Sequence, residues 1–289
     1  MKPSPTTCLI AALAAVLLAA CQQQPPGIAA SASASAPGTT APIIAAPAPP
    51  ATAGARLPGD HAVTRHFRIA ITLPTLPSGE KPLAEALRKT ADNGKRGFLQ
   101  ALPDPQRFPE LANRQFELLL KFKIVANTPI FTSVRETGMQ DTGGAHPIPV
   151  EAAFVYDRKA DKLITLDELF TDPDAARKAL ANFAHNTLLK KFTADAPQPG
   201  DGTSPAAVRE WKTSTVQMLD DGTAPTTVNY SVFVVRAGDG PSSPSPGITL
   251  VFPPYQVAPY VYGTQAVKVP AGIFSKFLKP DYRGDFAAQ

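Results

Sequence analysis

The chain has 289 residues, 44% of them hydrophobic, and a formal net charge of +4 at pH 7. This length allows one large domain or two small ones beyond residue 57. The weak positive charge gives no basis for nucleic-acid binding, so we expect no nucleic-acid partner. Both cysteines, Cys8 and Cys21, lie near the N-terminus, which excludes a disulfide in the rest of the chain.

Residues 1–20 are typical of a lipoprotein signal peptide. Lys2 precedes an apolar run that begins at Leu9, and the small residues Ala19 and Ala20 stand directly before Cys21. We expect the Cys21 thiol to receive a diacylglyceryl group before cleavage. An ordinary secretory signal that happens to contain a cysteine is the alternative. A transmembrane anchor is disfavoured, because the apolar run is too short to span the hydrocarbon of a membrane.

Lipidation of Cys21 predicts a cell-envelope protein whose membrane partner is reached through the lipid anchor. Gln22, rather than an aspartate, follows the cysteine, so in a Gram-negative host we expect the outer membrane, facing the periplasm. Residues 21–56 are mostly Ala, Pro, Ser, Thr, Gly and Gln, and no charged residue occurs between Pro3 and Ala55. This composition predicts an extended, disordered tether.

Hydrophobic periodicity predicts the elements of the first folded part, residues 57–140. Residues 66–73 alternate and predict a strand that ends before Pro74. Residues 80–91 predict an amphipathic helix. We expect an antiparallel meander with a Gly-rich loop at 140–146, built from strands at 115–126, 130–139 and 148–156.

The second part, residues 141–289, mixes helices with strands. After a turn at 157–162, Thr165 is expected to cap a single helical turn, and Ser204 to cap a helix that begins at Pro205. Another helix is predicted at 174–192, strands at 228–236, 248–252 and 266–269, and a short helix at 271–278. Because strands and helices are segregated, we predict an α+β fold, an antiparallel sheet with helices packed on one face.

Three segments carry a resemblance to a known family. They are Gly143-Gly144-Ala145-His146-Pro147, residues 154–157 leading to 163–170, and residues 252–260 followed by Gly263 and residues 267–270. Over residues 115–280 the chain resembles the RsiV-type extracellular domain, which is shared by a lysozyme-sensing anti-sigma factor and a non-catalytic part of a peptidoglycan deacetylase. Ala160-Asp161 departs from the small residue and glycine that the family usually has there. The resemblance implies lysozyme or peptidoglycan as a partner.

Two segments supply the candidate binding residues. Gly143 and Gly144 permit positive φ angles, so their loop is expected to present His146 beside exposed amides. The alternative is a histidine that hydrogen-bonds a strand end. The second segment holds three tyrosines: Tyr255, Tyr260 and Tyr262. An aromatic ring with a polar tip suits a strip that stacks on a glycan or contacts a protein, although such tyrosines also occur half-buried in cores.

An acidic run surrounds the turn at 157–162. It consists of Asp157, Asp161, Asp167, Glu168, Asp172 and Asp174. A local acidic patch would attract a basic partner such as lysozyme. The alternative is that these charges form only a solvated face.

No complete catalytic or metal-binding motif is found. The four histidines, His61, His66, His146 and His185, include no HExxH motif and no i,i+4 pair, so we expect no metal and no cofactor. Ser78 and Lys81 match Ser-x-x-Lys, but the companion motifs are absent. Asp167 and Glu168 are neighbours that would diverge rather than flank a substrate.

We therefore predict a membrane-anchored envelope lipoprotein with a non-catalytic binding domain that recognises lysozyme or a cell-wall glycan or protein. The alternative is an uncharacterised peptidoglycan-directed hydrolase, because a fold can bring distant carboxylates together.

Overall fold

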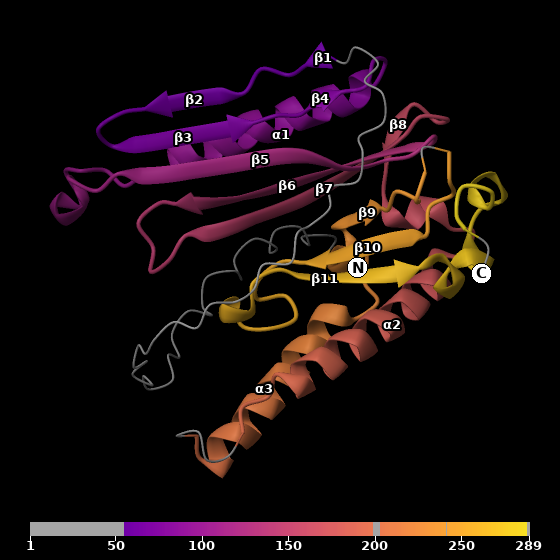
Figure 1. The fold of residues 1–289 in the computed structure, drawn as a ribbon. Coiled ribbons are helices and arrows are strands. Elements are labelled where there is room, and N and C mark those ends of the chain that lie inside the picture. The colour runs from indigo at the N-terminus through magenta and orange to yellow at the C-terminus, as the bar shows by residue number, and fades with distance from the viewer. Residues whose placement is uncertain (1–54, 199–202, 241, 288–289) are drawn as a thin grey trace, which may run out of the picture. The chain divides into compact units, whose positions relative to one another are not determined.

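The computed structural model describes residues 55–198, 203–240 and 242–287, and it is built around a six-stranded sheet (Figure 1). The strand order is β2-β3-β5-β6-β7-β8. The bounds are β2 Asp60–Val63, β3 Phe67–Thr72, β5 Phe116–Asn127, β6 Phe131–Asp141, β7 Ile148–Asp157 and β8 Lys162–Ile164. Two short strands, β1 (Ala55–Arg56) and β4 (Thr75–Leu76), pair separately. The four strands predicted between residues 66 and 156 are all present, with ends that differ by one or two residues.

The six-stranded sheet contains one parallel pair. β5, β6 and β7 form the predicted antiparallel meander, whereas β3 runs parallel to β5. A parallel pair requires a crossover connection, and α1 (Lys81–Gln100) provides it. The α+β class is confirmed, but the expectation of a purely antiparallel sheet is corrected at this pair.

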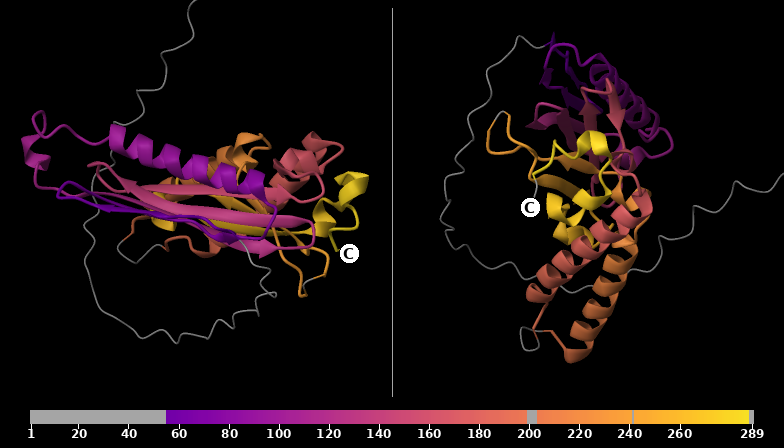
Figure 2. Two further views of the ribbon diagram at one scale, coloured as in Figure 1. Left: turned by 90° about the horizontal axis from the view of Figure 1, so that it is seen from above. Right: turned by 90° about the vertical axis from the view of Figure 1, so that its right-hand side faces the viewer.

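Helix α1 lies along one face of the large sheet (Figure 2). Its buried residues, Leu83, Leu87, Ala91 and Phe98, recur at helical spacing. The helix continues nine residues beyond its predicted end and includes Gly94. A Cβ at Gly94 would lie 2.9 Å from the Leu120 Cδ1 atom, so the glycine allows the helix to approach β5 closely.

Alternation along β6 and β7 separates two hydrophobic cores. Val134 and Tyr156 belong to the core on the α1 face. Phe131 and Val155 belong to a second core, which also contains the buried residues of α2 and of a smaller sheet. Helices therefore contribute to cores on both faces of the large sheet, where packing on a single face was expected.

The smaller sheet has the order β11-β10-β9 and is antiparallel. Its strands are β9 Phe233–Val235, β10 Gly247–Phe252 and β11 Gln265–Pro270. Beside it, α2 (Pro173–Ala194) and α3 (Pro205–Thr223) form a hairpin that extends away from both sheets (Figures 1 and 2). Within the strand predicted at 228–236, Val228–Tyr230 forms a 3-10 turn, η3, because the buried Tyr230 hydroxyl donates to the Thr223 carbonyl at 2.7 Å.

Side-chain caps lie at the start of two helical segments, as predicted. Thr165 and Glu168 form a capping box at η2 (Leu166–Leu169). Ser204 accepts from the Ala207 amide at 3.2 Å at the start of α3. The short helix predicted at 271–278 consists of two 3-10 turns, η5 (Ala271–Ile273) and η6 (Ser275–Phe277). Three other 3-10 turns are η1 (Pro109–Leu111), η4 (Tyr260–Tyr262) and η7 (Pro280–Tyr282).

The predicted signal peptide at 1–20, Cys21 and the tether at 21–56 lie outside the described residues, except that the last two tether residues form β1. The described residues all belong to one compact unit. Its sheet crosses the predicted boundary between residues 140 and 141, because β6 ends at Asp141 and pairs with β7. Among the described helices, none has the length and apolar character needed to cross a membrane.

Candidate functional site

The loop between β6 and β7 holds the first set of predicted site residues and is anchored at its base by Asp141. The Asp141 carboxylate accepts from the Gly143 amide at 3.0 Å and from Arg114 Nη2 at 2.9 Å. Burial opposes ionisation of this carboxyl, but the hydrogen bonds outweigh it and hold the pKa of Asp141 below its usual value. The loop therefore starts from a fixed, charged anchor.

Only one of the two predicted loop glycines needs to be glycine. Gly143 has a φ of 97°, and a Cβ there would lie 3.3 Å from the Phe116 ring. Gly144 does not have a positive φ, and a Cβ at that position would have the His146 carbonyl oxygen as its nearest neighbour, at 3.8 Å. Of the two glycines that permit a positive φ, only Gly143 adopts one.

The structure brings His146 together with two of the three predicted tyrosines, and we call His146, Tyr255 and Tyr260 the aromatic cluster. The His146 ring stacks on Tyr260, with centroids 4.3 Å apart and planes inclined by 25°. Tyr255 and Tyr260 are 5.6 Å apart at 32°. His146 Nε2 lies 2.9 Å from the Tyr255 hydroxyl. Three nearly parallel rings thus come from two segments that are distant in the sequence.

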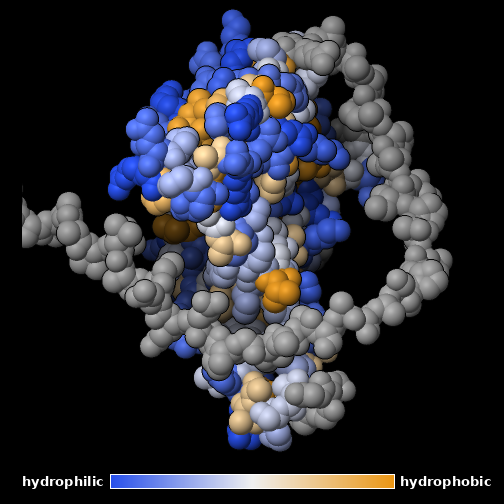
Figure 3. Space-filling view, turned by 90° about the vertical axis from the view of Figure 1, so that its left-hand side faces the viewer, coloured by the Kyte–Doolittle hydropathy of each residue, from blue (hydrophilic) through white to orange (hydrophobic). Residues whose placement is uncertain are grey.

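The aromatic cluster is open to solvent. Tyr255 is 53% exposed and Tyr260 is 37% exposed, and the adjacent Val261 is 85% exposed. The β6–β7 loop and the chain before β11 lie on the left of Figure 1, and Figure 3 views the molecule from that side. The surface there is mostly hydrophilic with scattered hydrophobic patches. Exposed ring faces in such surroundings suit a ligand that is itself partly polar.

The backbone that carries Tyr255 is strained and firmly held. Tyr255 has a φ of 71°, an uncommon conformation for a bulky residue. The next residue, Gln256, donates through Nε2 to the carbonyls of Gly222 and Asn229, both at 3.0 Å. Val257 and Ala258 are buried in the core. These contacts hold a conformation that would otherwise relax, and such strain is concentrated at functional sites.

The hydrogen bonds of His146 define its tautomer. Nδ1 lies 3.0 Å from the Pro147 carbonyl oxygen, which can only accept, so in the neutral ring Nδ1 carries the proton. Nε2 then accepts from the Tyr255 hydroxyl. Pro147 directly precedes β7, so the alternative prediction of a histidine bonded to a strand end also holds. The two bonds fix the ring orientation, and one face of the ring lies against Tyr260.

Tyr262 does not join the aromatic cluster. Its ring packs edge-to-face against Phe192 of α2, with centroids 5.4 Å apart. Tyr260 and Tyr262 both lie in the 3-10 turn η4. With three residues per turn, positions two apart point in different directions. The expectation of a three-tyrosine strip is therefore corrected at Tyr262, which is half-buried at the core.

The acidic run is engaged by internal partners. Two of its carboxylates accept hydrogen bonds: Asp157 from the Tyr282 hydroxyl at 2.6 Å, and Asp172 from the Ala175 amide at 3.0 Å. Two others form ion pairs: Asp167 with Arg177 at 2.5 Å, and Glu168 with Lys162 at 2.6 Å. Asp161 accepts from Tyr156, and Asp174 pairs with Arg177. The run stabilises the fold locally, so its density in the sequence does not translate into a patch of free carboxylates.

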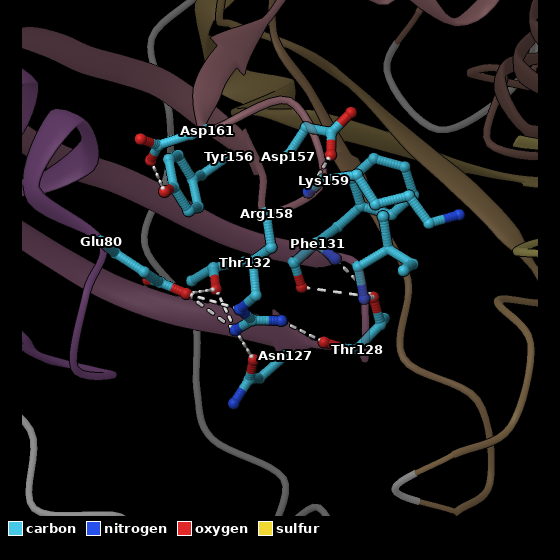
Figure 4. A network of polar contacts seen from close by, with 11 residues as sticks. Glu80, Asn127, Thr128, Phe131, Thr132, Tyr156, Asp157, Arg158, Lys159 and Asp161 are labelled. Atoms are coloured by element: carbon cyan, nitrogen blue, oxygen red, sulfur yellow. Dashed lines mark hydrogen bonds and ion pairs between the residues drawn. The ribbon is translucent and has the colours of Figure 1, made fainter. Parts of the chain in front are cut away.

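Arg158 is the centre of the polar network in Figure 4. Its guanidinium donates to Glu80 at 2.8 Å, to Thr132 at 2.5 Å, and to Asn127 and the Thr128 carbonyl. The Glu80 side chain is only 3% exposed. The network ties the β7–β8 turn to the start of α1 and to the β5–β6 turn, and it has the character of a structural clamp.

Asp161, in the β7–β8 turn, stands where the RsiV-type family usually has glycine, and its conformation explains how aspartate is accommodated there. Its φ is 51°, the left-handed conformation that glycine adopts most easily and aspartate tolerates. Its carboxylate accepts from the Tyr156 hydroxyl. Burial, together with this bond, raises the pKa of Tyr156 to about 12. Aspartate therefore replaces the usual glycine and gains a hydrogen bond.

Glu136 is a buried acid that the sequence analysis did not single out. It is 2% exposed, and burial, together with the negative charge of Glu151, raises its pKa to about 7. Glu151 itself pairs with Arg135 at 2.6 Å and accepts from Thr264 at 2.8 Å. Glu136 lies opposite Ala152 in the β6–β7 register, so the two acids lie on opposite faces of the sheet. They cannot flank one substrate as a catalytic pair.

Metal-ligating side chains do not gather in the described part of the chain, where no group of three or more His, Cys, Asp or Glu is placed to hold an ion.

Comparison with protein families matches residues 167–272 to a family described as a protein of unknown function (DUF3298). The match includes Tyr255, Tyr260 and Tyr262 but not the β6–β7 loop. It agrees with the predicted resemblance to the RsiV-type domain, over a shorter range than residues 115–280.

The chain is similar to a characterised protein and to solved structures of DUF3298 proteins. The relative is the peptidoglycan-N-acetylmuramic acid deacetylase PdaC of Bacillus subtilis, 23% identical over 216 residues, which are 75% of this chain and 40% of PdaC. The chain thus corresponds to less than half of that enzyme. A DUF3298 family member from Bacteroides fragilis has a TM-score of 0.51 at 16% identity, with 80% of this chain and 97% of that one covered. A DUF3298 protein from Pseudomonas aeruginosa has a TM-score of 0.47 at 14% identity, with 82% and 99% covered.

Proposed function

We propose that this chain, whose residues 167–272 match the DUF3298 family, is a cell-envelope binding protein that recognises a cell-wall glycan through the aromatic cluster. The observation that carries the proposal is the convergence of His146, Tyr255 and Tyr260 into a stacked, exposed set of rings. Lipidation at Cys21 would hold the protein at the membrane and let the domain reach the wall.

The chemistry of the aromatic cluster favours a sugar ring as ligand. The apolar face of a pyranose stacks on an aromatic ring, and the hydroxyl of a tyrosine serves its polar edge. The backbone holds Tyr255 in place, and stacking on His146 holds Tyr260. Because both rings are already ordered, binding a ligand costs little side-chain conformational entropy. The relative PdaC acts on peptidoglycan according to its name, which supports a wall glycan as the ligand class.

The charges of the chain argue against strong attraction of lysozyme. Lysozyme of the vertebrate type is basic, and a receptor gains association rate from an acidic surface. Once residues 1–20 are removed, 27 Lys and Arg face 24 Asp and Glu, so the mature chain is near +3. The acidic run is engaged internally. We therefore expect lysozyme to bind weakly, with an affinity that falls as salt rises.

Co-sedimentation with purified peptidoglycan sacculi tests the proposal. We expect the full chain to sediment with sacculi, and the double variant Tyr255→Ala/Tyr260→Ala to remain in solution while keeping the wild-type far-ultraviolet circular dichroism. Calorimetry with lysozyme at low salt runs in parallel. If the double variant sediments with sacculi as much as wild type does, the proposal is contradicted. If the wild type releases binding heat with lysozyme but does not sediment with sacculi, the ligand is a protein and not a glycan.

The anchor has its own test. Cys21→Ser should leave the protein unprocessed or released, and it should no longer partition into the detergent phase. Unchanged membrane fractionation would exclude lipidation at Cys21.

A further inference from the structure

Helix α3 presents one long side to solvent, because the α2–α3 hairpin extends away from both sheets (Figures 1 and 2). A shallow hollow follows this side of the helix. We call the residues that line it the α3 face: Lys212, Thr213, Val216, Gln217, Asp220 and Asp221. All six are exposed. They recur three and four positions apart, so they lie on one side of the helix.

The charges on the α3 face are ordered along the helix. Lys212 and, one turn earlier, the exposed Arg209 make its N-terminal half basic. Asp220 and Asp221 make the last turn acidic, and negative charge at a helix C-terminus opposes the helix dipole, so this order does not stabilise α3 itself.

These charges remain available to a partner. Arg209, Lys212 and Asp221 form no ion pair with another described residue. Asp220 pairs with His185 at 2.8 Å, but its side chain is still 59% exposed. The basic half and the acidic half therefore lack a full complement within the described part of the chain.

Val216 lies at the midpoint between the two halves. It is four residues from Lys212 and four from Asp220, so each charge lies about 6 Å from it along the helix axis. Its side chain is 41% exposed. It also borders a groove between α2 and α3 whose wall includes Phe192 and Trp211. The α3 face is thus basic, then apolar, then acidic.

We propose that two copies of this chain associate through the α3 face, with their α3 helices antiparallel and a twofold axis at Val216. In this arrangement Lys212 of each copy lies opposite Asp220 of the other, and the two Val216 side chains meet on the axis. A parallel arrangement would instead place like charges opposite each other. The antiparallel arrangement also puts the sheets of the two copies at opposite ends of the paired hairpins.

A second copy fits this face better than a partner whose charge has a single sign. Two basic residues, Arg209 and Lys212, balance two acidic residues, Asp220 and Asp221, so any strongly acidic or basic partner would be repelled by one half. The proposal is independent of glycan binding, because the aromatic cluster contains no residue of α3.

Sedimentation velocity of the full chain tests the association. The Cys21→Ser variant, which cannot be lipidated, serves as the parent protein, and a reducing agent prevents crosslinking through Cys8. We expect the weight-average sedimentation coefficient to rise with protein concentration toward that of a dimer. It should fall again when salt is added, because the ion pairs lie at the surface.

Charge reversals locate the contact. Because the axis repeats each pair, Lys212→Asp and Asp220→Lys each replace two attractions by two repulsions. The dissociation constant of the dimer should therefore rise about tenfold in either variant. An equimolar mixture of the two variants should associate as tightly as the parent, because one copy then presents two acidic positions to two basic ones. This recovery also shows that both variants are folded.

Glu210→Lys is the matched control for Asp220→Lys, since it makes the same change in charge on the same helix. Glu210 is exposed but points about 120° away from Val216 around the helix. We expect this variant to associate as the parent does.

Several results would overturn the proposal. A parent that stays monomeric at every concentration excludes the association. Single reversals that associate like the parent, or a mixture no tighter than either variant alone, place the contact elsewhere. Equal weakening by Glu210→Lys and Asp220→Lys shows that net charge, and not the α3 face, controls the association.

Discussion

The polar side chains at the two ends of β7 differ in their partners and in their exposure to solvent. At its C-terminal end, Asp157 and Arg158 bond to partners from distant elements, and the charged groups are engaged within the fold (Figure 4). At its N-terminal end, His146 and the two tyrosines bond mainly to one another and keep exposed ring faces. The difference teaches that the partners of a side chain, rather than its charge, distinguish a structural cluster from a binding surface.

The largest effect is expected at the structural end of β7. Arg158→Met would leave the Glu80 carboxylate buried without its cation, and we expect a loss of about 3 kcal/mol or more in the free energy of unfolding. Urea denaturation measures it. The matched control is Lys162→Met in the same turn, whose ion pair with Glu168 is solvent-exposed and should contribute far less to stability. Equal, small losses in the two variants would contradict a clamp role for Arg158.

Glu136 should make stability depend on pH. Its pKa rises from 4.5 in the unfolded chain to about 7 in the folded one, so the folded state binds the proton more tightly. The stabilisation is complete below pH 4.5, is lost as pH rises through 7, and amounts to on the order of 3 kcal/mol. Glu136→Gln, which stays neutral, should therefore gain stability relative to wild type between about pH 5 and pH 8.

The control for this pH series is Glu110→Gln, at an exposed position, which should follow the wild-type profile. Parallel profiles for wild type and Glu136→Gln would show that the Glu136 carboxyl does not change its protonation on folding.

At the opposite end of β7, adjacent glycines should respond differently. Gly143→Ala forces a side chain into a φ of 97° and against Phe116, at a cost of about 1 to 2 kcal/mol. Gly144→Ala has free space and should change the free energy of unfolding by less than about 0.5 kcal/mol. Thermal unfolding of both variants checks this pair, and equal losses would contradict the φ assignment.

Local patterns predicted much of the fold. The alternation in β5, β6 and β7 and the caps at Thr165 and Ser204 depend on neighbouring residues, so they could be predicted from the sequence. The parallel pairing of β3 with β5 could not, because strand direction depends on how α1 packs across the sheet. The 3-10 turn at Val228–Tyr230 likewise depends on the tertiary bond between Tyr230 and Thr223.

The candidate site was only partly accessible to sequence reasoning. His146 and Tyr255 are 109 positions apart, so their contact leaves no local signal. Tyr262 resembles Tyr260 in the sequence, and only the direction imposed by η4 separates the exposed ring from the one at the core. The role of Asp157 depends on Tyr282, 125 positions away.

The most direct test of the central claim, that the aromatic cluster contacts a glycan, is saturation-transfer difference NMR with chitotetraose as the probe. Saturating the aromatic protons of the full chain should transfer magnetisation to the sugar ring protons in wild type. Transfer should disappear in Tyr260→Ala and persist in Phe108→Ala, a matched exposed aromatic outside the cluster, 42% exposed against 37% for Tyr260. Equal transfer in Tyr260→Ala and wild type, or loss in Phe108→Ala alone, would contradict the account.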